Sequence, residues 1–273
     1  MSSDKGTAGT KRALCVGIND YPGTSSDLAG CVNDAKDWKA ALEARGYGVS
    51  TLLDSQATKS NMVTALKSLI DGAQSGDSVV FTFSGHGSWI PDASGDEPDD
   101  RDEMLCPHDI GSGGMLLDDE LATIFGRKRD GVRLYFISDS CHSGTVAKFA
   151  PSILPPEILK LQPRPRFLPP HAFLKEKSLR DAADRVAMFF GAKKQKYPAL
   201  LAAGCRDIEY SYDAHFGSRP NGAFSYFALK ALKGNPTSPR VWMNAIRESL
   251  PTATYPQTPS LYGSTTAKKG PMF

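Results

Sequence analysis

Residues 78–87 have the sequence Ser-Val-Val-Phe-Thr-Phe-Ser-Gly-His-Gly, and residues 132–144 have the sequence Val-Arg-Leu-Tyr-Phe-Ile-Ser-Asp-Ser-Cys-His-Ser-Gly. In each stretch an apolar run rich in β-branched and aromatic residues predicts a buried strand, and small or polar residues follow it at once. The ends of neighbouring parallel strands meet at one edge of a sheet. We therefore expect His86 and Cys141 to meet beyond two strand ends.

The sequence around these two strands alternates between strand and helix patterns. Strands are predicted at 12–18, 49–53, 78–83, 132–138 and 198–203. Helices are predicted from 31 to 45, from the N-cap residue Thr58 to Gly72, from the capping residue Asn221 to Lys233, and from Ser238-Pro239 to near Leu250. This alternation predicts a largely parallel sheet with helices on both faces and a ligand site beyond the carboxyl ends of the strands.

Composition places the chain among ordinary globular proteins. It has 273 residues, 40% of them hydrophobic, and a formal net charge of +2. No apolar run approaches the roughly 18 residues of a membrane span, and the N-terminus lacks the apolar segment of a secretion signal. The five cysteines include no CxxC pair, so they suggest neither a disulfide framework nor a zinc site. We therefore expect a cytoplasmic protein with reduced thiols and with no nucleic-acid or membrane partner.

His86 and Cys141 at two adjacent strand ends would form a nucleophile and its base. The imidazole would take the thiol proton, and the backbone amides of Gly87 and Cys141 would form an oxyanion hole. A lone cysteine or histidine is more often a core thiol or a loop side chain, but the paired placement favours catalysis. His142 is a competing base. It is disfavoured because adjacent residues of an extended chain point to opposite faces.

Two other chemistries were weighed. The sequence Cys141-His-Ser-Gly144 is also similar to the phosphate-binding loop of cysteine phosphatases. Those enzymes need an arginine six residues after the cysteine to bind phosphate bidentately, and Ala147 stands there. No GxGxxG or Walker pattern follows a predicted strand, so nucleotide binding has no support. A phosphatase or another His–Cys hydrolase is therefore a weak alternative.

The chain resembles a metacaspase, or the related bacterial orthocaspases, among the caspase-like cysteine peptidases. The matching stretches are Ala13–Tyr21, Leu28–Ala35, Phe83–Gly87, Asp118–Leu121, Ser138–Gly144, Ala203–Asp207 and Asn221–Phe224. The resemblance implies an α/β three-layer sandwich with a mainly parallel six-stranded sheet, in a monomer. It also implies a flexible N-terminus at 1–11, a large-subunit-like half at 12–147, a linker at 148–196 and a small-subunit-like half at 197–273.

The resemblance further implies an endopeptidase that works through a thioester, with Cys141 as nucleophile and His86 as general base. Residues matching the family's pocket for the residue before the scissile bond are Cys31, Asp34, Ser84 and Asp139. Two carboxylates there suit Arg or Lys and repel Asp, so the expected partners are proteins or peptides with Arg or Lys before the cut bond. Without the resemblance, Asp34 would be read as a helix-capping residue and Asp139 as a turn residue.

Residues 92–120 carry eleven acids against one base, Arg101. Such oxygen ligands suit calcium, although an acidic stretch is more often a solvated loop. The resemblance implies a calcium site matched by Asp102, Asp118 and Asp119. A further acidic ligand expected after the nucleophile is not present in Thr145-Val-Ala-Lys148. Two alternatives stay open: an enzyme that uses calcium and one that works without a cofactor.

Residues 148–196 carry eleven Lys or Arg against four acids and are rich in proline. A basic-specific peptidase with such a linker is expected to cut itself, near Lys193–Lys196 or Arg180. The alternative is an uncut surface loop, helical over 184–190. A different class of protein also stays open: an inactive caspase-like module that binds basic peptides or partner proteins. Such a module would be expected to have lost Cys141 or His86, and both are present.

Overall fold

A computed structural model describes residues 9–92, 101–141, 162–174, 181 and 197–273. A six-stranded sheet in the order β12-β9-β7-β3-β1-β2 runs through its centre. The strands are β1 (Lys11–Gly17), β2 (Gly48–Leu53), β3 (Ser78–Ser84), β7 (Arg133–Asp139), β9 (Leu200–Ala203) and β12 (Ser260–Tyr262). Every neighbouring pair is parallel except β9 and β12. The predicted sheet is confirmed.

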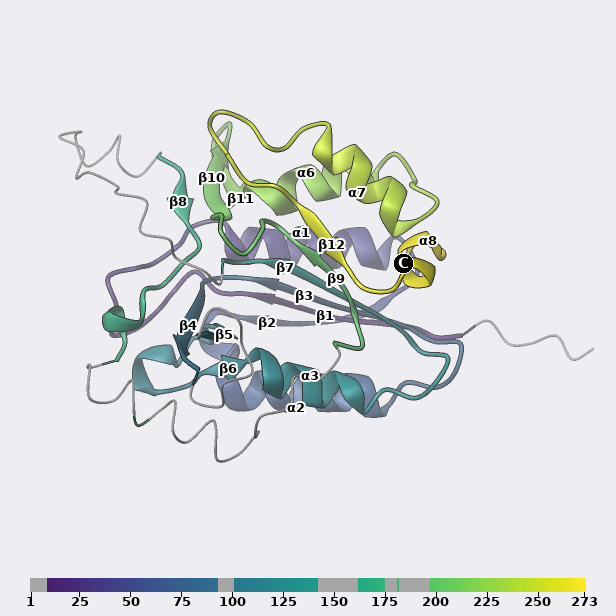
Figure 1. The fold of residues 1–273 in the computed structure, drawn as a ribbon, viewed down its shortest axis with the longest axis horizontal. Coiled ribbons are helices and arrows are strands. Elements are labelled where there is room, and N and C mark those ends of the chain that lie inside the picture. The colour runs from purple at the N-terminus through teal and green to yellow at the C-terminus, as the bar shows by residue number, and fades with distance from the viewer. Residues whose placement is uncertain (1–8, 93–100, 142–161, 175–180, 182–196) are drawn as a thin grey trace, which may run out of the picture.

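Helices cover both faces of this sheet (Figure 1). One face carries α1 (Cys31–Glu43), α6 (Ala223–Leu232) and α7 (Pro239–Arg247). The other carries α2 (Lys59–Asp71) and α3 (Asp118–Gly126), and the short α8 (Thr265–Lys269) lies near the C-terminus. Among the described residues, 3₁₀ turns lie at Asp54–Gln56, Ile110–Ser112 and Pro170–Ala172. The predicted three-layer α/β sandwich is confirmed.

Local sequence signals set the starts of α2 and α7. Thr58 accepts a hydrogen bond from the Asn61 amide at 3.3 Å, and Ser238 accepts one from the Val241 amide at 3.3 Å, as N-caps do. Asn221 does not cap α6, so that prediction is wrong. Its side-chain amide donates to a buried carboxylate instead, which needs hydrogen-bond donors once it is removed from water.

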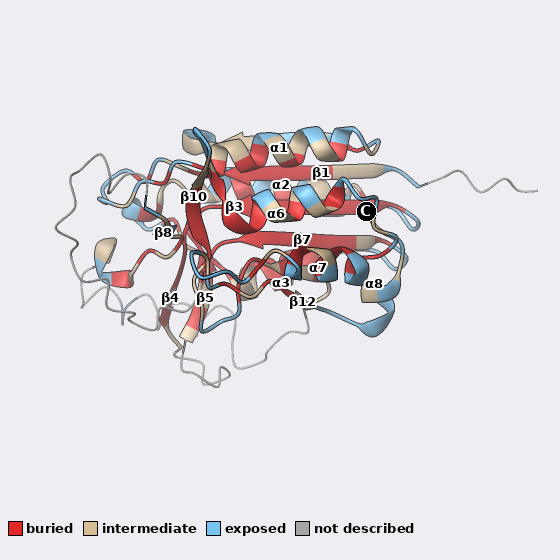
Figure 2. Ribbon diagram, turned by 90° about the horizontal axis from the view of Figure 1, so that it is seen from above, coloured by how far each residue is buried: buried red, intermediate tan, exposed pale blue. Residues whose placement is uncertain are grey.

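The core has one layer on each side of the sheet, and the strands between the two layers are largely buried (Figure 2). Along β7, Leu134 and Phe136 pack with the α2 and α3 side, whereas Tyr135 and Ile137 pack with the α1, α6 and α7 side. Burial of both faces explains why the strands are continuous apolar runs. The same alternation carries on to the strand end, where Asp139 contacts the amide of Ser225 in α6.

Two small sheets stand at the carboxyl end of the large sheet (Figure 1). One contains β4 (Gly87–Pro91), β5 (Arg101–Leu105) and β6 (Leu116–Leu117); the other contains β8 (Arg164–Pro165), β10 (Tyr212–Phe216) and β11 (Arg219–Gly222). The sequence did not predict these strands because they are short and contain many polar residues. Among the described residues, no helix combines the length and apolarity that crossing a bilayer requires.

Candidate active site

The two strand ends singled out by the sequence are neighbours. β3 and β7 pair in parallel with Ser84 opposite Asp139. His86 and Cys141 each lie two residues beyond that pair, and both are buried, with 2% and 0% of their surface exposed. The expected meeting of the two strand ends at one edge of the sheet is confirmed.

His86 is held so that one ring nitrogen is available as a base. Its Nε2 lies 2.6 Å from the Ser26 carbonyl oxygen, which only accepts hydrogen bonds, so in the neutral ring Nε2 carries the proton and Nδ1 the lone pair. Nδ1 has no hydrogen-bond partner among the described residues. Burial lowers the pKa of His86 to about 4, which keeps the ring neutral at physiological pH.

Contacts with Tyr21 and with the Ser26 carbonyl fix the position of this histidine. The His86 amide donates to the Tyr21 hydroxyl at 2.7 Å, and the two rings lie 4.8 Å apart between centroids. The Ser26 carbonyl orients the imidazole as a third catalytic group often does. The sequence showed no such group because a main-chain carbonyl is present at every residue and leaves no signature.

Cys141 lies against Ser211, a residue that sequence reasoning missed. The Ser211 amide donates to the sulfur, and Sγ lies 3.3 Å from the Ser211 carbonyl oxygen. The Cys141 amide donates to the carbonyl oxygen of Arg166 at 3.2 Å, and the Gly87 amide donates to the same oxygen at 3.0 Å. Two amides thus converge on one carbonyl oxygen, which is the arrangement an oxyanion hole requires.

The side chain of Arg166 ends among three buried aspartates, which we name the acidic pocket: Asp34, Asp139 and Asp213. Its guanidinium lies 2.7 Å from Asp34, 3.1 Å from Asp139 and 3.0 Å from Asp213. Arg166 itself is 0% exposed. Asp34 and Asp139 were predicted to form a pocket for a cation, whereas Asp213, from β10, was missed.

Backbone and amide N–H groups hold each carboxylate of the acidic pocket. The donors are Gly222 N (3.0 Å) and Asn221 Nδ2 (2.8 Å) to Asp34, Ser225 N (2.9 Å) to Asp139, and Ala29 N (2.8 Å) and Gly30 N (3.0 Å) to Asp213. Burial raises the pKa of Asp34 to about 7, and the Arg166 guanidinium opposes this rise. A bound cation therefore helps to keep Asp34 ionised.

Gly222 forms one wall of the acidic pocket. A Cβ at this position would lie 2.1 Å from Asp139 Oδ2 and 2.5 Å from Arg166 Nη1. Only glycine leaves room for a guanidinium here. Gly222 belongs to the stretch Asn221–Phe224, which matched the family pattern in the sequence. Only the fold shows that this glycine lies against Asp139 and the Arg166 guanidinium.

The two other predicted pocket residues lie beside the acidic pocket. Cys31 is the first residue of α1, and Ser84 is the last residue of β3, opposite Asp139. Burial raises the pKa of Cys31 well above its usual range, and the nearby Arg166 guanidinium opposes that rise. The side chain of Arg166 donates its hydrogen bonds to the Asp34 and Asp213 carboxylates and to the Asp139 carbonyl oxygen. Substrate contacts by Cys31 and Ser84 stay a prediction.

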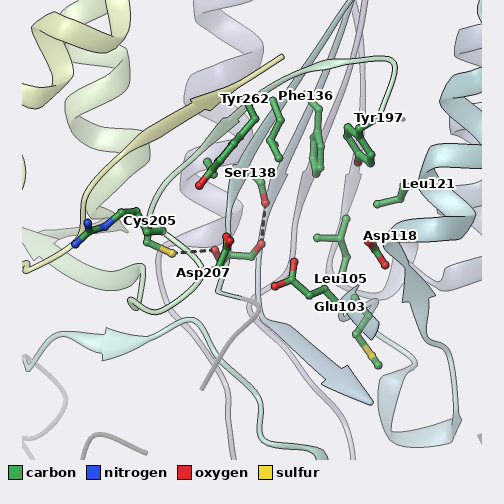
Figure 3. Close-up of a pocket in the computed structure, with 15 residues that line it drawn as sticks. Glu103, Leu105, Asp118, Leu121, Phe136, Ser138, Tyr197, Cys205, Asp207 and Tyr262 are labelled. Atoms are coloured by element: carbon green, nitrogen blue, oxygen red, sulfur yellow. Dashed lines mark hydrogen bonds between the residues drawn. The ribbon is translucent and has the colours of Figure 1, made fainter. Parts of the chain in front are cut away.

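A second acidic region, which we name the Cys205 hollow, opens on the α3 side of β7 (Figure 3). Its lining includes Glu103, Asp118, Phe136, Tyr197, Cys205 and Asp207. The hydroxyls of Ser138 and Ser140 lie 2.7 Å apart at its edge, and Cys205 Sγ lies 3.7 Å from the Ser140 carbonyl oxygen. The hollow thus adjoins the residue before Cys141.

Of the predicted calcium ligands, Asp118 lines this hollow. Asp102 is in β5 opposite Ile90, and Asp118 and Asp119 begin α3. Across the described ranges, no three Asp, Glu, His or Cys side chains are arranged to hold a metal ion. Residues 96–100 and 145–148 lie outside the described residues. Calcium binding therefore stays a prediction.

Several other predictions also fall outside the described residues. These are the cut sites at Arg180 and 193–196, the helix over 184–190, and the positions of His142 and Ala147. The part of the linker that is described, residues 162–174, carries Arg166 into the acidic pocket.

Known proteins share this sequence and fold. The family model for the metacaspase, peptidase C14 domain matches residues 11–150. Metacaspase-1A of Aspergillus fumigatus is 33% identical over 93% of this chain and 68% of that protein. The chain belongs to the metacaspase family. Metacaspase-1 of Cryptococcus neoformans is 34% identical over 94% of this chain, which spans 63% of that longer protein.

A solved structure has a similar fold. A crystal structure of a Geobacter sulfurreducens protein superposes with a TM-score of 0.75 at 31% identity, over 96% of this chain and 97% of that one. The predicted resemblance to metacaspases is confirmed, whereas the orthocaspase alternative stays a prediction. Membership places the chain in a family of cysteine peptidases.

Proposed function

We propose that this metacaspase-family chain is a cysteine endopeptidase that hydrolyses peptide bonds after Arg or Lys. One observation carries the proposal: Arg166 is fully buried with its guanidinium in the acidic pocket and its carbonyl oxygen on the amides of Gly87 and Cys141. A substrate residue bound in the same way would present its carbonyl carbon beside the thiol. The acidic pocket and the oxyanion hole are thus positioned to bind the side chain and the carbonyl oxygen of the same substrate residue.

In the proposed reaction, Cys141 Sγ attacks the carbonyl carbon while His86 Nδ1 takes the thiol proton. The two amides stabilise the negative oxygen that develops, and the imidazolium then gives its proton to the leaving amine. Water hydrolyses the resulting thioester and restores the thiol. His86 suits this role because its Nδ1 is available while Nε2 is held by the Ser26 carbonyl.

Charge and shape of the acidic pocket support the preference for a basic residue. Each of the three carboxylates contacts the Arg166 guanidinium, and all three are buried. An aspartate in their place would be repelled, and an apolar side chain would leave the carboxylates without a counter-charge. A lysine would be accepted as a point charge, with fewer directional hydrogen bonds than an arginine. Cleavage within the basic linker follows from the same preference.

Hydrolysis of matched fluorogenic peptides ending in Arg, Lys or Asp tests this function, for wild type and Cys141→Ala, with and without millimolar calcium. We expect cleavage after Arg and Lys that disappears in the variant. Cleavage after Asp would contradict the pocket assignment. Binding of basic peptides without hydrolysis would support the second candidate, an inactive module, which the occupancy of the acidic pocket by Arg166 also fits.

A further inference from the structure

Gln257 is a fully buried polar side chain that joins two segments of the active site. It lies in the chain between α7 and β12 and is 0% exposed. Its Nε2 donates to the Gly204 carbonyl at 2.8 Å and to the Ser211 hydroxyl at 3.2 Å, and its Oε1 accepts from the Tyr212 amide at 3.2 Å. Gly204 follows β9, and Ser211 precedes β10. Gln257 therefore ties the end of the large sheet to the ribbon formed by β10 and β11.

The groups around Gln257 fix the direction of each hydrogen bond. A main-chain carbonyl only accepts and a main-chain amide only donates, so the side-chain nitrogen must face Gly204 and the side-chain oxygen must face Tyr212. The Ser211 hydroxyl accepts from Nε2 and donates its own proton to Asp139 Oδ1. A directed chain of hydrogen bonds thus runs from Gln257 through Ser211 to the acidic pocket.

Ser211 connects this chain of hydrogen bonds to the reacting atoms. Its amide donates to the Cys141 sulfur, and its carbonyl oxygen lies 3.3 Å from the same sulfur. That carbonyl also accepts the Arg166 amide at 2.8 Å, and the amide of a bound substrate residue would take the same place. An amide N–H supports a thiolate more strongly than a thiol, because hydrogen bonds to a charged acceptor are stronger. A small displacement of Ser211 should therefore raise the barrier to attack by Cys141.

Close packing around Ser211 makes its position depend on Gln257. A Cβ added to Gly204 would lie 2.9 Å from Ser211 Oγ and 3.0 Å from Phe224 Cβ. Ser211 and Phe224 are both 0% exposed. In such surroundings water does not replace a lost hydrogen bond, so the groups that Gln257 pairs must either move or stay unpaired. Loss of the Gln257 amide should therefore displace Ser211.

We propose that Gln257 is a positioning residue, which holds Ser211 so that the Ser211 main chain supports the Cys141 sulfur and the Ser211 hydroxyl supports Asp139. The inference rests on the proposed function and adds to it a residue that acts only through its neighbours. Asp34 and Asp213 have their own main-chain N–H donors, which do not involve Gln257. The loss of Gln257 should therefore lower kcat more than it raises KM.

Steady-state hydrolysis of a fluorogenic Arg peptide tests the proposal with Gln257→Met, Gln257→Glu and Ser211→Ala. Gln257→Met keeps a similar volume but removes all three hydrogen bonds, so kcat should fall about 10- to 100-fold while KM changes less than about threefold. Gln257→Glu keeps the acceptor for Tyr212, but its carboxylate cannot donate to Gly204 or Ser211, so kcat should fall at least as far. Ser211→Ala should also lower kcat. In the Ser211→Ala background, Gln257→Met should lower kcat by a smaller factor than it does in wild type.

Two controls separate positioning from a loss of stability. Gln56→Met changes an exposed glutamine whose Oε1 accepts from the Leu53 amide at 3.3 Å, and it should change neither kcat nor the melting temperature. Ile246→Val removes a methylene from the core on the α1, α6 and α7 side. It should lower the melting temperature and leave kcat unchanged. A purely structural role for Gln257 would give the same pattern as Ile246→Val.

The possible failures are distinguishable. A wild-type kcat in folded Gln257→Met or Gln257→Glu overturns this inference and leaves the proposed function standing. Equal factors for Gln257→Met in the wild-type and Ser211→Ala backgrounds do the same. If Gln257→Met does not fold, Ser211→Ala decides, because it removes only the hydroxyl group, and an unchanged kcat then overturns the inference. A wild type that hydrolyses neither Arg nor Lys peptides overturns the proposed function, and this inference with it.

Discussion

The acidic pocket and the Cys205 hollow lie on opposite sides of the end of β7, and each contains three acidic side chains. Asp34, Asp139 and Asp213 of the acidic pocket are at most 4% exposed, and N–H groups hold every one of them. In the Cys205 hollow, Glu103 and Asp118 are half-buried and Asp207 is exposed. The number of acids therefore does not distinguish the two regions, whereas their burial does.

This difference has an energetic basis. A carboxylate removed from water is costly unless hydrogen bonds and a counter-charge replace its hydration, so the acidic pocket gains most from a cation that brings several directional donors. Acids that keep contact with water stay solvated and are screened by it, so a cation gains little from approaching them. We therefore expect substitutions in the acidic pocket to alter catalysis far more than equivalent substitutions in the Cys205 hollow.

The largest effect is expected for Asp213→Asn, which removes one charge from the acidic pocket but keeps a similar shape. Removing one partner of a buried ion pair costs about 3–5 kcal/mol, which corresponds to about 100- to 1000-fold or more in kcat/KM for an Arg peptide. We expect the loss to appear mainly in KM. Steady-state hydrolysis measures it, and thermal unfolding of the same sample controls for misfolding. A loss below about fivefold would show that Asp213 does not bind the substrate cation.

Gly222→Ala is expected to have the next largest effect. The added methyl group would overlap Asp139 Oδ2 and the guanidinium position, since its Cβ would lie 2.1 Å and 2.5 Å from them. Overpacking of this kind costs about 1–3 kcal/mol, or about 5- to 160-fold in kcat/KM for Arg peptides. The matched control is Gly48→Ala in β2, where the nearest atom would be 3.9 Å away. Equal losses in both variants would contradict a role for Gly222 in the pocket.

A pH profile should separate the two acidic regions further. Because the pKa of Asp34 is raised to about 7, this carboxyl gains a proton as the pH falls below 7 and loses its attraction for the substrate cation. We expect kcat/KM for Arg peptides to fall about tenfold per pH unit there. His86, with a pKa of about 4, should not contribute to this fall above pH 5. Asp34→Asn should flatten the profile, and an unchanged slope would exclude Asp34 as the titrating group.

The raised pKa of Asp34 also affects stability, and this effect depends on pH in the opposite direction. An unfolded Asp34 ionises near its ordinary value of 3.8, whereas the folded one ionises near 7. The contribution of Asp34 to the free energy of unfolding is therefore lost as the pH rises from 3.8 to about 7. Substrate cleavage and the Asp34 contribution to stability should change in opposite directions between pH 5 and 7.

The sequence alone can predict a site residue when the role of that residue depends on its own segment of the chain. The strand ends, His86 and Cys141 followed from apolar runs and the rule that parallel strands end at one edge. Asp34 and Asp139 followed only from the family resemblance, since capping and turn roles explained them equally well. Only the three-dimensional structure shows that both carboxylates pair with a buried guanidinium.

The missed residues share one property: their roles depend on contacts between distant segments. Asp213 and Ser211 come from a ribbon too short to be predicted, and they meet the large sheet only in three dimensions. The Ser26 carbonyl acts through main chain, which carries no residue signal. Arg166 was one of eleven basic residues in the linker, and nothing in its local sequence distinguished it from the others.

The smallest effect is expected for Asp118→Asn in the Cys205 hollow. Asp118 lies at the start of α3, where it is half-buried, and in calcium-free buffer its substitution should change kcat/KM for an Arg peptide by less than about twofold, as is usual away from a buried charge. Measuring the same variant and wild type in millimolar calcium sharpens the comparison. If calcium stimulates wild type and Asp118→Asn abolishes that stimulation, the Cys205 hollow is a cation site after all. Burial would then no longer be what separates the two regions, because a half-buried acid would hold its ion through oxygen ligands alone.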